Sequence, residues 1–109
     1  MIPDTVYRTF VERGTEWADK HGAAELLEGS LKSLKAQYTL EARQAEGCSM
    51  AESETIALSC SQYRDAMREA VEARTEANRA RVRYDAVKAL FEAQRTAEAS
   101  ERAAMRSAT

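Results

Sequence analysis

Apolar residues recur at every seventh position in the second half of the chain, and a second apolar line follows three residues behind the first. The two lines consist of Tyr63, Ala70, Ala77, Tyr84 and Phe91, and of Ala66, Ala73, Ala80 and Val87. This is the a and d spacing of a coiled coil, in which a narrow apolar stripe faces another helix. Residues 63–106 contain no glycine or proline, so they predict one helix about 66 Å long. A helix with so narrow a stripe requires a partner.

The first half repeats this pattern from residue 10 onward. The apolar residues that recur at every seventh position are Phe10, Trp17, Ala24, Leu31, Tyr38 and Ala45. Leu27 and Leu34 lie three or four residues from these positions. Pro3 and Asp4 mark a helix start, where the Asp4 carboxylate complements the helix dipole. A second long amphipathic helix is therefore predicted.

Three glycines, Gly14, Gly22 and Gly29, weaken this first helix. Each costs about 1 kcal/mol relative to alanine in a helix interior. We therefore expect a break or kink near His21–Gly22. Residues 1–22 then either form a separate short N-terminal helix or fray.

The segment between the two long helices predicts a bend. Gly47 suits the left-handed conformation that closes a helix. Ser49 followed by Glu52 has the spacing of a capping box and predicts a short helix over Met50–Leu58. Because the two seams have similar lengths, the predicted fold is all-α. It is an antiparallel hairpin of two long helices, with a short helix at the bend and a coiled-coil-like seam.

The predicted seam of the hairpin and its oligomer draws on both long helices. Its residues are Trp17, Leu27, Leu31, Leu34, Tyr38, Tyr63, Ala70, Ala77, Tyr84, Val87 and Phe91. We expect Tyr38 to lie near Tyr63 at the bend, and Trp17 to face the Val87–Phe91 end. After Phe91 the seam positions become polar, so residues 95–109 are predicted to project as a tail or to contact a partner.

Length and composition favour a single helical domain over residues 1–109 that assembles with copies of itself. Much of the 44% hydrophobic content is alanine, which buries little area, so the core is thin and oligomerisation, most simply a homodimer, would complete it. No apolar run approaches the length of a membrane span, and the N-terminus lacks the layout of a signal peptide. A cytoplasmic protein without a membrane partner is expected.

Charge is distributed unevenly between the two halves. Residues 1–62 hold 6 basic and 10 acidic side chains, whereas residues 63–109 hold 10 basic and 8 acidic ones. The resulting net charges of −4 and +2 favour halves that fold back on one another. The excess of positive charge in the second half is too mild to indicate a nucleic-acid surface.

A row of cations borders the second seam. It consists of Arg74, Arg81, Lys88, Arg95 and Arg102. Acidic residues three or four positions away favour a solvated helix face with surface ion pairs. The competing interpretation is a face that contacts phosphates or an acidic partner, and its candidate residues are Arg79, Arg81, Arg83, Arg95 and Arg102. Intrinsic nucleic-acid binding is not favoured, because Tyr84 and Phe91 fall on the seam and not beside the cations.

The sequence contains no catalytic or metal-binding pattern. There is no glycine-rich phosphate loop and no paired ligand spacing, and His21 is the only histidine. Cys48 and Cys60 are expected to be free thiols in a reducing compartment, and Cys60 has no nearby base to activate it. We predict a protein without enzymatic activity, metal or cofactor.

Four segments of the chain carry a resemblance to known proteins: Met50–Tyr63, Glu76–Asp85, Phe91–Ala97 and Glu101–Arg106. They resemble a group of small helical proteins encoded by tailed phages and prophages, and the most specific part is Ala-Asn-Arg-Ala-Arg-Val-Arg-Tyr at 77–84. The resemblance covers roughly residues 26–106. It implies a helical hairpin and an early-region gene near recombination and single-strand-annealing functions, and it implies no catalytic residue.

Three functions follow as hypotheses. The first is an accessory protein of phage DNA metabolism that contacts a phage protein or DNA through one helix face. The second is an inhibitor of a host defence nuclease or of another bacterial enzyme, in which an acidic N-terminal surface mimics nucleic acid. Its candidate carboxylates are Glu12, Glu16, Asp19, Glu25 and Glu28. The third is an assembly module that bridges two phage proteins.

Overall fold

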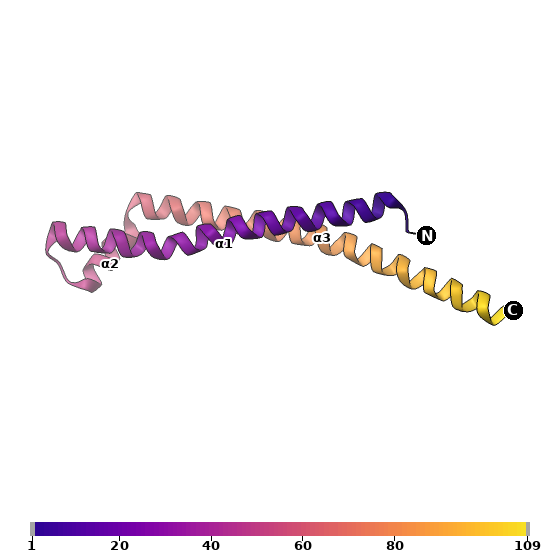
Figure 1. Cartoon of the computed structure of the whole chain (residues 1–109). Coiled ribbons are helices and arrows are strands. Elements are labelled where there is room, and N and C mark those ends of the chain that lie inside the picture. Colours follow the sequence, from indigo (N-terminus) through magenta and orange to yellow (C-terminus); the bar gives the residue numbers. More distant parts are fainter. Residues whose placement is uncertain (1, 109) are drawn as a thin grey trace. The chain divides into compact units, whose positions relative to one another are not determined.

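The computed structural model describes residues 2–108, which form three α-helices. Helix α1 comprises Asp4–Glu46, α2 comprises Met50–Ser59 and α3 comprises Ser61–Ala108 (Figure 1). Early residues of α1 contact late residues of α3, as in the Tyr7–Phe91 ring pair, so the long helices pack antiparallel. The predicted all-α hairpin with a short helix at the bend is confirmed. Met1 and Thr109, which the predicted domain also includes, lie outside the described residues.

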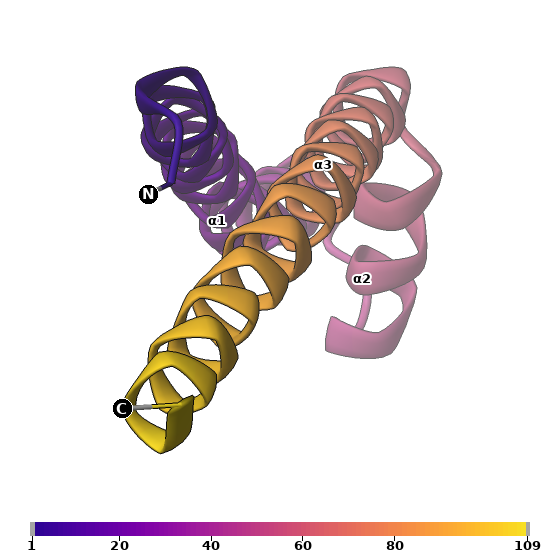
Figure 2. The same cartoon turned by 90° about the vertical axis from the view of Figure 1, so that its right-hand side faces the viewer.

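The hairpin divides into two compact units, and each long helix contributes to both. Unit 1 comprises Met1–Asp19 with Asn78–Thr109, and unit 2 comprises Lys20–Ala77. Helix α2 belongs wholly to unit 2. Figure 2 shows the chain passing from α2 directly into the start of α3. Unit 1 is thus built from the start of α1 and the end of α3. Unit 2 contains the remainder of both helices and the bend.

The bend follows the predicted local signals. Gly47 has a φ of 64°, and its N–H donates to the carbonyl of Arg43 at 2.9 Å, which closes α1. The hydroxyl oxygen of Ser49 accepts the N–H of Glu52 at 3.3 Å and caps α2. The short helix ends at Ser59, one residue later than the predicted end at Leu58.

Helix α1 continues without a break through His21–Gly22, which corrects the expectation of a separate N-terminal helix over 1–22. The glycine penalty of about 1 kcal/mol per residue does not outweigh the packing of a long helix. Gly14 also has a packing role in unit 1, because an added Cβ would stand 3.2 Å from Tyr84 Cε2. A side chain at this position would compete with the tyrosine ring for the same space.

Aromatic rings hold unit 1 together. The Phe10 ring centroid lies 5.0 Å from that of Phe91 and 5.4 Å from that of Tyr84. Trp17 stacks on Tyr84 at 5.4 Å. Trp17 was expected to face the Val87–Phe91 end, but it stacks about one turn before Val87, and Phe91 meets Phe10 and Tyr7. The observed pairs Phe10–Phe91 and Trp17–Tyr84 have the same register as the expected pair Tyr38–Tyr63.

Mainly small residues form the core of unit 2. Its buried apolar side chains are Ala24, Ala57, Ala70 and Ala77, together with one large side chain, that of Tyr63. Two polar residues, Thr39 and Ser53, are also buried, although the apolar pattern did not single them out. The Ser53 hydroxyl donates to the Ser49 carbonyl at 2.8 Å, so burial leaves it with a partner.

The other predicted seam residues are less exposed than their neighbours. Trp17, Leu27, Leu31, Leu34, Tyr38, Tyr84, Val87 and Phe91 are all half-buried. From residue 99 to residue 108 every side chain is exposed. Within residues 2–108, none of the helices combines the length and the apolar character that a membrane crossing requires.

A thin core leaves much surface in contact with water. The accessible surface is 7916 Å². A compact monomer of 12.1 kDa is expected to expose about 6,000 Å². Several large apolar side chains contribute to this surface, among them Leu26, Leu40, Val71 and Val82.

Candidate interaction surface

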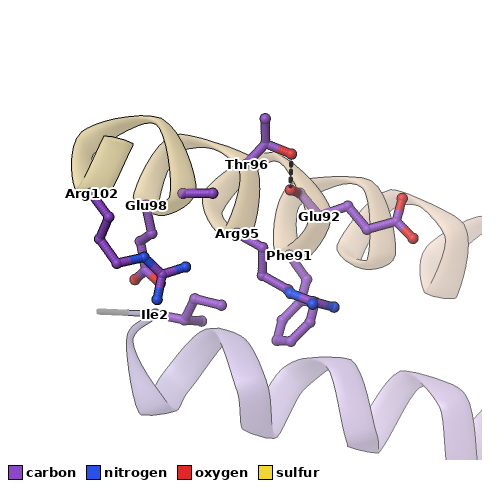
Figure 3. A pocket seen from close by; sticks show the side chains of 8 residues that line it. Ile2, Phe91, Glu92, Arg95, Thr96, Glu98 and Arg102 are labelled. Atoms are coloured by element: carbon purple, nitrogen blue, oxygen red, sulfur yellow. Dashed lines mark hydrogen bonds between the residues drawn. The ribbon is translucent and has the colours of Figure 1, made fainter. Parts of the chain in front are cut away.

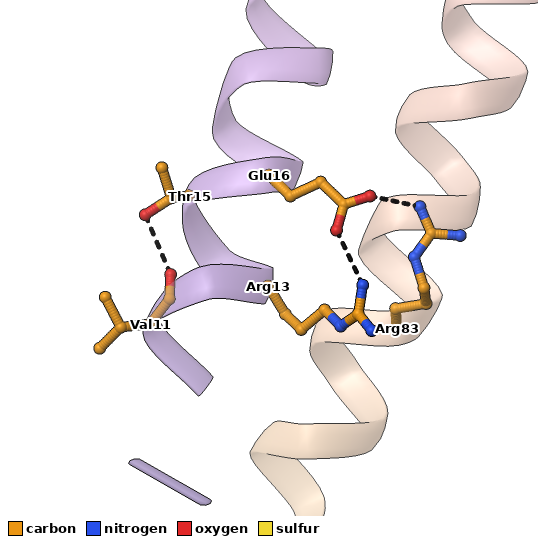
Figure 4. A network of polar contacts seen from close by, with 5 residues as sticks. All are labelled: Val11, Arg13, Thr15, Glu16 and Arg83. Carbon is orange, nitrogen blue, oxygen red and sulfur yellow. Dashed lines mark hydrogen bonds and ion pairs between the residues drawn. The ribbon is translucent and has the colours of Figure 1, made fainter. Parts of the chain in front are cut away.

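Two helices of unit 1 are joined by an ion pair around Glu16 (Figure 4). Arg83 of α3 donates to one carboxylate oxygen of Glu16 at 2.6 Å, and Arg13 of α1 donates to the other at 3.0 Å. The hydrogen bond from Arg83, followed by that from Arg13, holds the pKa of Glu16 below its ordinary value. Arg83, a candidate for partner binding, is therefore already engaged within the hairpin.

The other arginines of the 79–83 run do not form one free cationic face. The Arg81 guanidinium lies 5.8 Å from the Trp17 ring centroid, in a cation–π arrangement. Its Nε is also 3.8 Å from the Asp85 carboxylate. Arg79 is exposed. Of the three, Arg79 and Arg81 remain accessible to a partner, and Arg83 is half-buried.

Arg95 and Arg102 line a groove in unit 1 (Figure 3). The groove has a volume of about 590 Å³, and Phe91 and Ile2 supply its apolar surface. The Arg95 guanidinium lies 6.0 Å from the Phe91 ring centroid, and the Arg102 side chain extends toward Ile2. Glu92 and Glu98 also line the groove. It thus combines an apolar surface with two positive and two negative groups.

In unit 2, Arg74 joins α3 to α1. It donates to both carboxylate oxygens of Glu28, at 2.9 and 2.6 Å. This hydrogen bonding lowers the pKa of Glu28 and raises that of Arg74. Arg74 was expected in a solvated row of cations, but its side chain is only 30% exposed. The antiparallel register explains the difference, because it places the acidic half of the hairpin against this arginine.

Arg74 and Glu25 also flank His21 in unit 2. The Arg74 Nη1 atom lies 3.0 Å from Nδ1 of His21. The Nε2 atom on the other side of the ring lies 3.0 Å from a carboxylate oxygen of Glu25. The imidazole therefore lies between a guanidinium and a carboxylate.

A second groove, of about 480 Å³, lies in unit 2 between the end of α1 and the start of α2. Ala36, Leu40 and Met50 supply its apolar surface, and its polar lining consists of Lys32, Lys35, Thr39, Arg43 and Glu54. The sequence reasoning missed this surface because Leu40 lies off the seam. The sequence signal that could have indicated this groove was a leucine at a position outside the heptad seam.

The remaining candidate chemistry is limited to the cysteines. Cys48 and Cys60 are free and half-buried, and Cys48 Sγ lies 3.1 Å from Ser53 Oγ. Among residues 2–108, no group of three or more His, Cys, Asp and Glu side chains is placed to hold a metal ion. No protein-family model, no curated protein and no solved structure matches this chain significantly.

Proposed function

We propose that this chain is a non-enzymatic interaction protein of phage or prophage DNA metabolism, which acts as a homodimer in the bacterial cytoplasm. The groove lined by Phe91, Arg95 and Arg102 is the observation that supports this function. Arginine and phenylalanine side chains are enriched in protein interfaces, where they combine apolar contact with directed hydrogen bonds. The phage context comes from the resemblance of residues 26–106.

The groove fits a protein segment better than a nucleic acid. Arg95 and Arg102 alternate with Glu92 and Glu98, so a polyphosphate strand would meet as much repulsion as attraction. A peptide with a bulky apolar residue between opposite charges can pair with both signs and place its apolar side chain on Phe91. The proposed partner is therefore a phage recombination or annealing protein that presents such a segment.

Crosslinking pull-down from phage-infected cells tests the proposal. The wild-type bait is expected to capture one specific protein, and the double variant Arg95→Glu/Arg102→Glu is expected to lose it. Lys88→Glu is the matched control, because Lys88 is exposed on the same helix and does not line the groove. Equal capture by all three baits would refute the role of the groove. Salt-dependent retention on single-stranded DNA that Arg79→Glu abolishes would favour direct DNA binding instead.

The nuclease-inhibitor hypothesis draws less support from the geometry. Two of its five candidate carboxylates, Glu16 and Glu28, are bonded to Arg83 and Arg74. A nucleic-acid mimic needs its carboxylates free to face the nuclease. The bridging-module hypothesis is compatible with a homodimer that presents two copies of the groove.

A further inference from the structure

One face of α1 within unit 2 is exposed and carries no charge. It consists of Gly22, Leu26, Gly29, Ser33, Ala36 and Leu40. At 3.6 residues per turn, these six positions fall within an arc of about 80°. Leu26 and Leu40 are 72% and 56% exposed, far more than seam leucines. This face, called the outer face below, lies apart from the seam that joins α1 to α3.

The two glycines of the outer face have no packing role within the described chain. A Cβ added at Gly22 or Gly29 would meet no atom within 4 Å. Neither glycine has a positive φ, since Gly47 alone among the described residues does. Each nevertheless costs about 1 kcal/mol of helix stability relative to alanine. Glycine on a helix surface allows another backbone to approach closely.

We propose that a second copy of this chain packs antiparallel on the outer face. The spacing of the six residues is 4, 3, 4, 3 and 4, which reads the same in both directions about residue 31. A two-fold axis there places Gly22 opposite Leu40 of the other copy, Leu26 opposite Ala36, and Gly29 opposite Ser33. Each leucine then meets a small residue, as a self-complementary interface requires. Parallel pairing would place leucine on leucine and glycine on glycine, with clashes and voids in turn.

Charge on one of the two edges of the outer face is compatible with this pairing. Glu25 and Lys32 lie on the same edge, and the two-fold axis brings the same edges of both copies together. Glu25 of one copy then lies about 7.5 Å along the helix axis from Lys32 of the other, within reach of long side chains. The edge as a whole combines two carboxylates with two ammonium groups and has no net charge.

The apolar surface also continues beyond the outer face. The groove around Leu40 and Met50 adjoins the outer face and extends the apolar surface that a second copy can cover.

The inference rests on the homodimer part of the proposed function and not on the groove at Arg95. If the wild-type protein is monomeric up to millimolar concentration, the homodimer and this interface both fail. The capture of a partner through Arg95 and Arg102 would still be tested separately by the pull-down described above. The two failures are therefore distinguishable.

The variant Gly29→Leu separates assembly from folding. In the isolated hairpin the new side chain has open space and a better helix propensity, so helicity and melting should not decrease. In the dimer it collides with Ser33 of the other copy. Sedimentation velocity is expected to show a wild-type dimer and an association weakened by at least about tenfold in the variant. Ala23→Leu, an exposed position outside the outer face, should dimerise as the wild type does. Unchanged association of Gly29→Leu would overturn the proposal.

Disulfide trapping tests the direction of pairing. In a Cys48→Ser/Cys60→Ser background, Gly29→Cys and Ser33→Cys proteins of different tag size are mixed and oxidised. Antiparallel pairing predicts a mixed disulfide in preference to either self-linked product. Self-linked Ser33→Cys as the main product would indicate parallel pairing and overturn the register. A monomeric protein that loses a foreign helical partner on Leu26→Asp would show that another protein covers this face.

Discussion

Units 1 and 2 use the same heptad spacing, but unit 1 packs large aromatic side chains along its seam and unit 2 packs mainly small ones. Unit 1 packs Phe10, Trp17, Tyr84 and Phe91 against one another. Unit 2 buries mainly alanines along its seam. Since the separation of packed helices depends on the side chains at the contact, the same pattern of positions specifies two different kinds of packing. Heptad spacing therefore predicts which residues face the seam, while residue volume decides how the seam responds to substitution.

The largest expected effect is in unit 1. Tyr84→Ala removes a ring that contacts Phe10 and Trp17, and should lower the free energy of unfolding by about 3 kcal/mol. Urea denaturation followed by circular dichroism measures the change. Leu90→Ala, at an exposed position of the same helix, should cost no more than about 0.5 kcal/mol. Equal losses for the two variants would mean that the aromatic seam does not hold unit 1.

In unit 2 the harmful change is an increase in size. Ala77→Leu places three extra carbons in a buried alanine position and should destabilise the fold by about 2 kcal/mol in the same measurement. Val71→Leu, which enlarges an exposed side chain of the same helix, serves as the control and should be nearly neutral. A stabilising Ala77→Leu would show that the seam of unit 2 contains unfilled space.

Two glycines of α1 provide a smaller contrast between the units. Gly29→Ala should raise the free energy of unfolding by about 1 kcal/mol at concentrations where the protein is monomeric, because its surroundings are open. Gly14→Ala should raise the free energy of unfolding only slightly. Its Cβ would stand 3.2 Å from Tyr84 Cε2, and this close contact offsets the gain in helix propensity. Thermal melting of both variants compares them. Equal gains would show that the Tyr84 ring moves aside freely.

The smallest expected effect concerns a feature that the units share, an arginine–glutamate pair between α1 and α3. The pKa values of Glu16 and Glu28 are lowered by their arginines. A carboxylate with a lowered pKa stabilises the fold above its unfolded pKa of about 4.3, and this contribution is lost as pH falls through the folded pKa. Melting temperature should therefore decrease modestly below about pH 4.5, since both pairs are partly exposed. Glu16→Gln/Glu28→Gln should flatten this decrease, and an unchanged slope would contradict the assignment.

Much of the fold could be predicted because local signals determine it. Gly47 and Ser49 act within a few residues of themselves, and the seam follows from spacing alone. The register was predicted only to within about one turn, because its exact value depends on the length of chain between Glu46 and Ser61. Trp17 was expected to face Val87–Phe91, whereas the observed register brings it to Tyr84. The burial of Thr39 also depends on this register and carries no apolar signal.

The candidate surface was predictable only in part. The cation row includes Arg95 and Arg102, which line the groove, but the engagement of Arg83 by Glu16 requires knowing which turns of α1 and α3 meet. The approach of Ile2 to the end of α3 requires the same knowledge. The outer face of α1 is visible in the sequence as a charge-free stripe. The heptad pattern does not indicate it, because it lies outside the seam.

The central claim is that the two units carry separate surfaces, one for a partner and one for a second copy. One crosslinking measurement tests this claim most directly. Tagged and untagged copies are expressed together in phage-infected cells, and the recovered partner and untagged copy are quantified in the same sample. Arg95→Glu/Arg102→Glu is predicted to lose the partner and to retain the untagged copy. Retention of the partner, or loss of both proteins together, would contradict the assignment of separate surfaces.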